Sequence, residues 1–135
     1  MPKKSLNTSK VKLFKMNYGR VMKELKAYGK HCSQRGAKAV ILIGSLARGD
    51  YTAFSDADVI IVVYDSGVDL TNFMDSSLSV EVEPRTYTEE QLIDMARKGR
   101  RLIREIIDSG IVLYGDSTIM KKIRDSYVEL SSEQH

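Results

Sequence analysis

Apolar residues recur every three or four positions along the N-terminal part of the chain, with lysines between them. This spacing puts the apolar side chains on one face of a helix, so it predicts an amphipathic helix over residues 9–30. We expect Ser9 to cap its start and Gly29 or Gly36 to end it. The predicted apolar face, whose aromatic members we assign to core packing, comprises Val11, Phe14, Tyr18, Val21, Leu25 and Tyr28.

Four later runs predict β-strands. Residues 38–43 and 57–64 are almost wholly apolar and β-branched, which is typical of strands buried inside a sheet. Residues 78–87 alternate apolar and polar side chains, but Pro84 lacks an N–H group, so this strand is expected at an edge or interrupted there. Residues 111–114 form the fourth predicted strand.

The C-terminal part of the chain predicts two further helices. Thr88 and Gln91 fit a capping box, and the apolar spacing after them predicts one helix as far as Asp108. A last helix is expected to begin at Asp116 or Ser117 and to end before a tail at residues 131–135.

The order of these elements predicts an α/β fold with a small mixed sheet of about four strands packed by helices. We expect a single domain over residues 1–135, with residues 1–8 and 131–135 flexible. Residues 68–77 have no clear pattern, and we expect at most a helical turn there.

The composition indicates the cellular compartment in which the protein is found. The single cysteine, Cys32, cannot form an internal disulfide, which favours a reducing compartment. The N-terminus lacks the apolar segment of a secretory signal, and no apolar run reaches the roughly 20 residues that span a bilayer. We therefore expect a cytoplasmic protein that does not interact with membranes.

The charge is strongly asymmetric. Residues 1–38 carry eleven lysines and arginines and one glutamate, a balance of +10, whereas the rest of the chain has a balance of −7. Such a basic segment indicates an anionic ligand or partner, which could be a nucleic acid, or only a solvated helix face. The sequence leaves both interpretations open.

The polar connector between the first two strands carries the candidate chemistry. Asp56 and Asp58 are two positions apart at the start of a strand, so they are expected to point to the same face. Carboxylates held this close repel unless a cation lies between them, and oxygen ligands suit Mg²⁺ or Mn²⁺. The alternative is that Ser55 and Asp56 only form a turn.

The other end of the connector predicts a phosphate site. Gly44 allows backbone N–H groups to approach a phosphate, and Ser45 adds a hydroxyl if residues 45–48 form a helical turn. Arg48 could then pair with a phosphate oxygen, or alternatively with Asp50. If both ends of the connector face one crevice, the arrangement suits metal-assisted phosphoryl or nucleotidyl transfer.

The run GSLARG at Gly44–Gly49, followed by SDADV at Ser55–Val59, resembles the signature of the DNA polymerase β-type nucleotidyltransferase superfamily, in particular its minimal nucleotidyltransferases. The resemblance covers roughly residues 38–64. It implies that Asp56 and Asp58 bind two Mg²⁺ ions, or Mn²⁺ in their place, and that Gly44 and Ser45 contact the phosphates of a nucleoside triphosphate, with ATP as the expected donor. A third carboxylate is implied as a further catalytic and metal ligand, either Glu83, which we favour, or Glu81.

The resemblance also implies transfer of a nucleoside monophosphate to an unknown acceptor. No second domain is expected after Gly115, so the acceptor would be small or would belong to a partner protein. Proteins of this kind often act beside a helical HEPN partner in toxin–antitoxin systems. The alternative is a non-catalytic, nucleotide-binding antitoxin or adaptor module, and a nucleic-acid-binding role is a third possibility. The oligomeric state stays open, and the two histidines, His31 and His135, are assigned no role.

Overall fold

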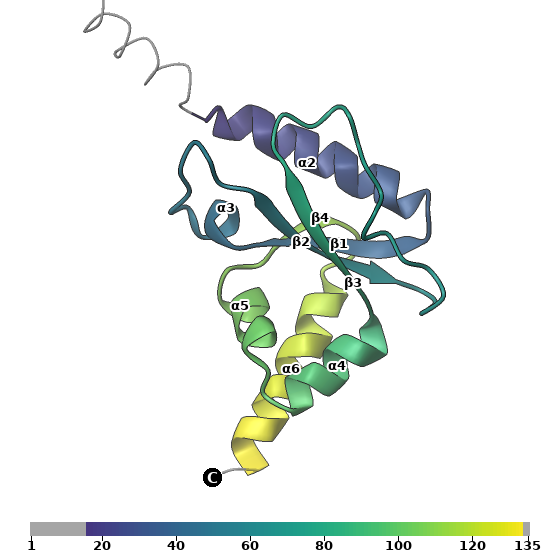
Figure 1. Cartoon of the computed structure of the whole chain (residues 1–135). Coiled ribbons are helices and arrows are strands. Elements are labelled where there is room, and N and C mark those ends of the chain that lie inside the picture. The colour runs from purple at the N-terminus through teal and green to yellow at the C-terminus, as the bar shows by residue number, and fades with distance from the viewer. Residues whose placement is uncertain (1–15, 134–135) are drawn as a thin grey trace, which may run out of the picture.

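A computed structural model describes residues 16–133 of the chain. Within this range the chain forms a four-stranded sheet and five helices (Figure 1). The elements are, in order, α2 (Tyr18–Ser33), β1 (Ala37–Ile43), α3 (Ser45–Arg48), β2 (Ala57–Val63), β3 (Val82–Thr88), α4 (Glu89–Arg97), α5 (Arg101–Ser109), β4 (Ile111–Tyr114) and α6 (Thr118–Glu133).

The sheet is mixed, with the strand order β3-β2-β1-β4. Strand β1 runs antiparallel to both β2 and β4, and β2 runs parallel to β3. The predicted fold class, a small mixed α/β sheet packed by helices, is therefore confirmed. Pro84 lies in β3, at an edge of the sheet, as its missing N–H group predicts.

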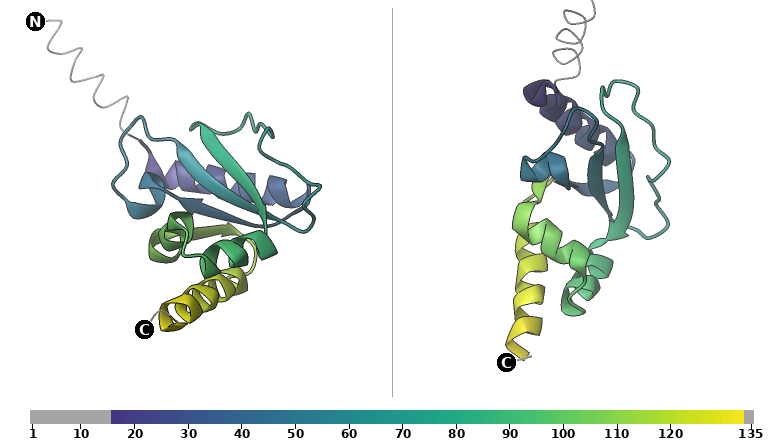
Figure 2. Two further views of the ribbon diagram at one scale, coloured as in Figure 1. Left: turned by 60° about the horizontal axis from the view of Figure 1, so that its bottom comes forward. Right: turned by 60° about the vertical axis from the view of Figure 1, so that its left-hand side comes forward.

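Helices cover both faces of the sheet (Figure 2). Helix α2, α3 and the segment between β2 and β3 pack on one face, and α4, α5 and α6 pack on the other. Successive residues of β1 and β2 alternate between the two hydrophobic clusters, which explains why both strands are apolar along their length. In β2, the first face takes Ala57, Val59, Ile61 and Val63, and the second takes Ile60 and Val62.

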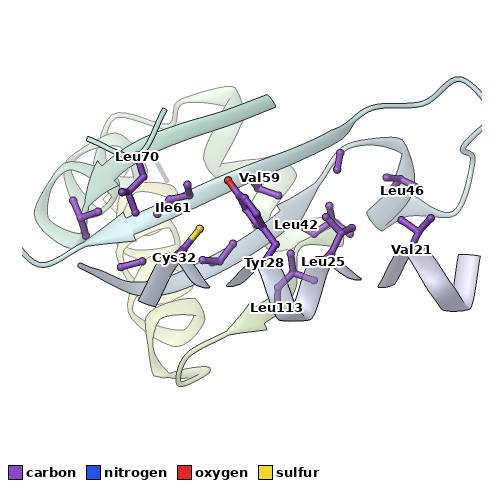
Figure 3. Packing of buried hydrophobic residues seen from close by; sticks show 14 residues of the cluster. Val21, Leu25, Tyr28, Cys32, Leu42, Leu46, Val59, Ile61, Leu70 and Leu113 are labelled. Atoms are coloured by element: carbon purple, nitrogen blue, oxygen red, sulfur yellow. The ribbon is translucent and has the colours of Figure 1, made fainter. Parts of the chain in front are cut away.

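The cluster on the α2 side contains one buried hydroxyl group (Figure 3). Tyr28 is 1% exposed, its ring stacks on Phe73 with centroids 5.7 Å apart, and its hydroxyl has no hydrogen-bond partner among the described residues. Cys32 lies one helical turn later, and burial raises the pKa of its thiol to about 11. Tyr28 and Cys32 are therefore core residues, as predicted for Tyr28.

Helix α2 differs from its prediction at both ends. It begins at Tyr18, where the side chain of Asn17 accepts a hydrogen bond from the N–H group of Arg20 at 3.1 Å. The predicted cap at Ser9 lies outside the described residues. Gly29 does not end the helix, which continues to Ser33; a turn then leads to Gly36, the other predicted end, which has a φ of +106°. A side chain at residue 29 would lie 2.8 Å from Tyr114 Cβ, so this glycine lets α2 pack closely on β4.

The third strand begins four residues later than predicted, at Val82. Strand β2 begins at Ala57, which pairs with Val82, so the residues before Val82 have no neighbouring strand. The backbone N–H and the hydroxyl of Ser79 instead bind the Glu24 carboxylate of α2, both at 2.7 Å. Residues 64–81 form turns, without the helical turn considered for residues 68–77.

The prediction of one helix up to Asp108 is wrong, because the chain turns between α4 and α5. Gly99 adopts a φ of +65°, and the N–H groups of Gly99 and Arg100 bind the carbonyls of Ala96 and Met95. These two bonds form a Schellman motif, which ends a helix at a left-handed residue, usually glycine. The predicted capping box at the start of α4 is present, with Thr88 and Gln91 bonded reciprocally.

The last helix is longer than predicted. The Asp116 carboxylate accepts a hydrogen bond from the N–H group of Thr118 at 3.0 Å, and α6 continues to Glu133. Residues 131–133 are therefore helical rather than a tail, since they contain neither glycine nor proline to end the helix. The other residues predicted to be flexible, 1–8 and 134–135, lie outside the described range. Between residues 16 and 133, no helix combines the length and apolar character that crossing a membrane requires.

Candidate active site

The bend after β1 lies directly against the Asp58 carboxylate. Ile43, the last residue of β1, is paired with Asp58 in β2, and Gly44 follows with a φ of +80°. A Cβ atom on Gly44 would collide with Asp58 Oδ2. The glycine therefore allows the backbone to approach this carboxylate, so the bend at Gly44 and Ser45 is in contact with Asp58.

Helix α3 is a single turn over Ser45–Arg48, as predicted, and a residue of helix α2 stabilises it. The Tyr18 hydroxyl of α2 donates a hydrogen bond to the Leu46 carbonyl at 3.0 Å. The Tyr18 ring also stacks on Tyr51 of the connector, with centroids 4.9 Å apart. Sequence analysis assigned Tyr18 to core packing only, and its apolar spacing gives no sign of this second role.

The Ser45 hydroxyl links the two ends of the connector. It donates to Ser55 Oγ at 3.0 Å, and Ser55 Oγ accepts the N–H group of Thr52 at 2.8 Å. Ser55 immediately precedes Asp56. Ser45, predicted to contact phosphate, is thus tied to the segment that carries the aspartates, and this link is not evident from sequence spacing.

Arg48 forms two ion pairs across the site. Its Nε lies 3.3 Å from Asp50 Oδ2, the alternative partner considered from the sequence, and its Nη1 lies 3.1 Å from Glu105 Oε1 in α5. Glu105 is 57 positions away in the sequence, so nothing in the local pattern could predict this contact. The predicted contact of Arg48 with phosphate stays a prediction.

Glu83, rather than Glu81, lies beside Asp58. Glu83 is paired with Asp58 on the adjacent parallel strand, where paired residues share a face. The pKa of Glu83 is raised, first by its hydrogen bond with Asp58, and then by the negative charges of Asp58 and Asp56. Glu81 precedes β3, and its backbone carbonyl accepts the N–H group of Ala57 at 2.8 Å.

A cavity of about 440 Å³ borders the site at Asp56. The start of α2, the connector and residues 79–81 enclose it, and its polar lining includes Arg20, Ser55, Asp56 and Glu81. Its volume is within the usual range for small-molecule sites. Glu81 therefore borders the cavity beside Asp56, whereas Glu83 borders Asp58.

The three carboxylates of Asp56, Asp58 and Glu83 suit a hard divalent cation. They offer only oxygen ligands, and the raised pKa of Glu83 indicates mutual repulsion that a cation would relieve. Over residues 16–133, no three Asp, Glu, His or Cys side chains already form a closed group of metal ligands. Binding a cation would therefore require these side chains to converge.

Comparison with known proteins identifies the family of the chain. The family described as "Polymerase beta, Nucleotidyltransferase" matches residues 23–119. Comparison with curated protein sequences found no significant match.

Three similar solved structures are chains of toxin–antitoxin complexes. One complex, solved with AMP-PNP, gives a TM-score of 0.54 at 19% identity, covering 88% of this chain and 93% of that chain. A mutant MntA-HpeT complex with two aspartates replaced by glutamate gives 0.52 at 17% identity, with 88% and 93% covered. A second MntA-HpeT mutant, with a tyrosine replaced by alanine, gives 0.52 at 19% identity, with 89% and 93% covered. At these identities the likeness shows a shared fold.

Proposed function

Since the chain belongs to the polymerase β nucleotidyltransferase family, we propose that it is a Mg²⁺-dependent enzyme that transfers a nucleoside monophosphate from a nucleoside triphosphate, with ATP as the preferred donor. An acceptor hydroxyl would form a new bond to the α-phosphorus, and pyrophosphate would leave with the bonding electron pair. The observation that carries the proposal is the contact between Gly44 and the Asp58 carboxylate, with Glu83 on the neighbouring strand.

Each residue of the site has a proposed role. Asp56, Asp58 and Glu83 would bind the Mg²⁺ ions, and Mg²⁺ supplies positive charge that neutralises the phosphates of the bound nucleotide. The backbone at Gly44 and the hydroxyl of Ser45 would contact the triphosphate, and Arg48 would pair with a phosphate oxygen. Glu83 could also accept the proton of the attacking hydroxyl, because its carboxylate lies beside Asp58 on the neighbouring strand.

We also propose that the chain acts with a partner protein in a toxin–antitoxin system. The supporting observation is the shared fold with chains of toxin–antitoxin complexes, one of which was solved with AMP-PNP. A helical HEPN-type protein is the proposed partner, and one of its side-chain hydroxyls is the proposed acceptor. The free, buried thiol of Cys32 is compatible with the cytoplasm as the proposed location.

The proposal is tested by incubating the purified protein, with and without its co-expressed genomic neighbour, with Mg²⁺ and each α-³²P-labelled triphosphate. We expect label on the partner, with ATP the best donor. Asp58→Asn should reduce transfer at least about 100-fold, because metal-ion catalysis contributes several kcal/mol.

Asp94→Asn is the matched control, since Asp94 lies in α4 and pairs with Lys98 at the surface. This variant should label the partner at the wild-type rate. Undiminished transfer by folded Asp58→Asn protein would refute the assignment.

A second function is motivated by the fold that the chain shares with a chain of a toxin–antitoxin structure solved with AMP-PNP. The chain would then be a non-catalytic, nucleotide-binding antitoxin or adaptor. A stable complex with the partner, combined with no incorporation from any of the four triphosphates, would support this function over catalysis.

A further inference from the structure

We propose that Glu105 of α5 competes with the nucleotide phosphates for Arg48, and so sets the affinity of the site for the triphosphate. The inference rests on the proposed function, because it takes the phosphate ligand of Arg48 from there. It adds a residue outside the Gly-Ser and Asp-x-Asp segments, on a helix that approaches the site from the other end of the sequence.

The ion pair between Arg48 and Glu105 joins two helices whose paired residues are 57 positions apart in the sequence. Arg48 is the last residue of α3, four positions after Gly44, and Glu105 lies in the middle of α5. Their side chains are 3.1 Å apart, and are 45% and 32% exposed. Asp50, the other partner of Arg48, is 64% exposed, so solvent weakens its hold on Arg48 more.

Glu105 and a phosphate would use the same donors. A guanidinium group presents five N–H donors in a planar fork, which fits a carboxylate and a phosphate equally well. In the structure the guanidinium N–H groups of Arg48 bind the carboxylates of Asp50 and Glu105. A triphosphate bound at Gly44 and Ser45 would meet these negative charges unless Arg48 turned from Glu105 to the phosphate.

Helix α5 contains a substitute partner for Glu105. Arg101 is exposed and lies four residues before Glu105, which places the two side chains on the same face of the helix. When Arg48 moves to the phosphate, Arg101 can pair with Glu105. The carboxylate then keeps a cation, which limits the competition to a few-fold in affinity.

The test measures binding of α,β-methylene-ATP, which cannot lose pyrophosphate, to the full chain in Mg²⁺ by calorimetry. Glu105→Gln should tighten binding about two- to five-fold, the range expected from the loss of one partly exposed competing ion pair. Arg48→Gln should weaken binding about ten-fold or more. In the Arg48→Gln background, Glu105→Gln should have no further effect, because the competition needs the guanidinium.

The matched control is Asp108→Asn. Asp108 lies one turn after Glu105 on the same helix, pairs with Arg104 at 3.7 Å and is 65% exposed, so the variant removes an equal charge without touching Arg48. Equal affinity of Glu105→Gln and Asp108→Asn, or tightening that persists in the Arg48→Gln background, would overturn the competition while leaving the proposed function intact. Wild-type protein that binds no nucleotide at all would overturn both.

Discussion

One methyl group added at Gly44 should impair both the stability of the fold and the binding of nucleotide. Its φ of +80° and ψ of −161° lie in a region that only glycine adopts readily, and its missing Cβ makes room for the Asp58 carboxylate. Gly44→Ala therefore imposes two costs, a strained backbone and a displaced metal ligand. Gly49→Ala is a matched control, because Gly49 has a φ of +91° and a Cβ there would meet nothing within 4 Å.

Gly44→Ala should lower the free energy of unfolding more than Gly49→Ala does. Gly49→Ala should lower the free energy of unfolding by about 1–2 kcal/mol, the cost of a left-handed conformation with a side chain. Gly44→Ala should cost about 1–3 kcal/mol from the backbone alone, and more from the contact with Asp58. Moving Asp58 by about 1 Å should also reduce nucleotidyl transfer by on the order of 100-fold.

Urea unfolding gives the free energies, and calorimetry in Mg²⁺ with α,β-methylene-ATP gives the affinities. We expect Gly49→Ala to bind the nucleotide like wild type and folded Gly44→Ala to bind it poorly. If Gly44→Ala costs no more than Gly49→Ala and binds the nucleotide normally, the contact with Asp58 does not shape the site, and the reasoning fails.

Three further predictions concern single side chains. The pKa of Glu83 is raised, so the folded protein holds the proton of this carboxyl more tightly than the unfolded chain does. Metal-free protein should therefore lose stability as the pH rises from 4.5 through the raised pKa. Urea unfolding across this pH range should show a smaller loss of stability in Asp58→Asn than in wild type. Tyr28→Phe removes a buried hydroxyl whose contact with the Cys32 thiol falls short of hydrogen-bond geometry, and it should raise the free energy of unfolding by up to about 1 kcal/mol. A clear decrease would show that the contact with Cys32 is a stabilising hydrogen bond. Thr88→Ala removes the capping box of α4 and should lower the free energy of unfolding by about 1 kcal/mol in the same assay, and an unchanged value would contradict the role of the cap.

Much of the sheet and its helices could be predicted from the sequence because periodicity reports burial. The first two strands lie between two clusters, and their continuous apolar runs predicted them within one residue at each end. The strand at residues 111–114 agrees exactly in its bounds because Gly110 and Gly115 mark its limits. The turn at Gly99 was also predictable in principle, but Met95, Ala96 and Ile103 keep helical spacing across it, so the two helices look continuous in the sequence.

Tertiary contacts explain what sequence patterns did not predict. The alternation at residues 78–81 resembles a strand, yet Glu24 of α2 binds the Ser79 backbone and no strand lies alongside. Within the site, the spacing of Asp56 and Asp58 predicts a metal site, which stays a prediction, while strand register decides that Glu83 meets Asp58. The roles of Tyr18 and Glu105 depend on helices far away in the sequence.

Pro84 in the edge strand constrains how another chain can reach the site. It follows Glu83 directly, and a proline offers no N–H group to an incoming strand. A peptide that tried to extend the sheet beside Glu83 would lose a hydrogen bond, which disfavours binding of an extended strand at this edge. The same proline discourages copies of the chain from joining edge to edge into aggregates.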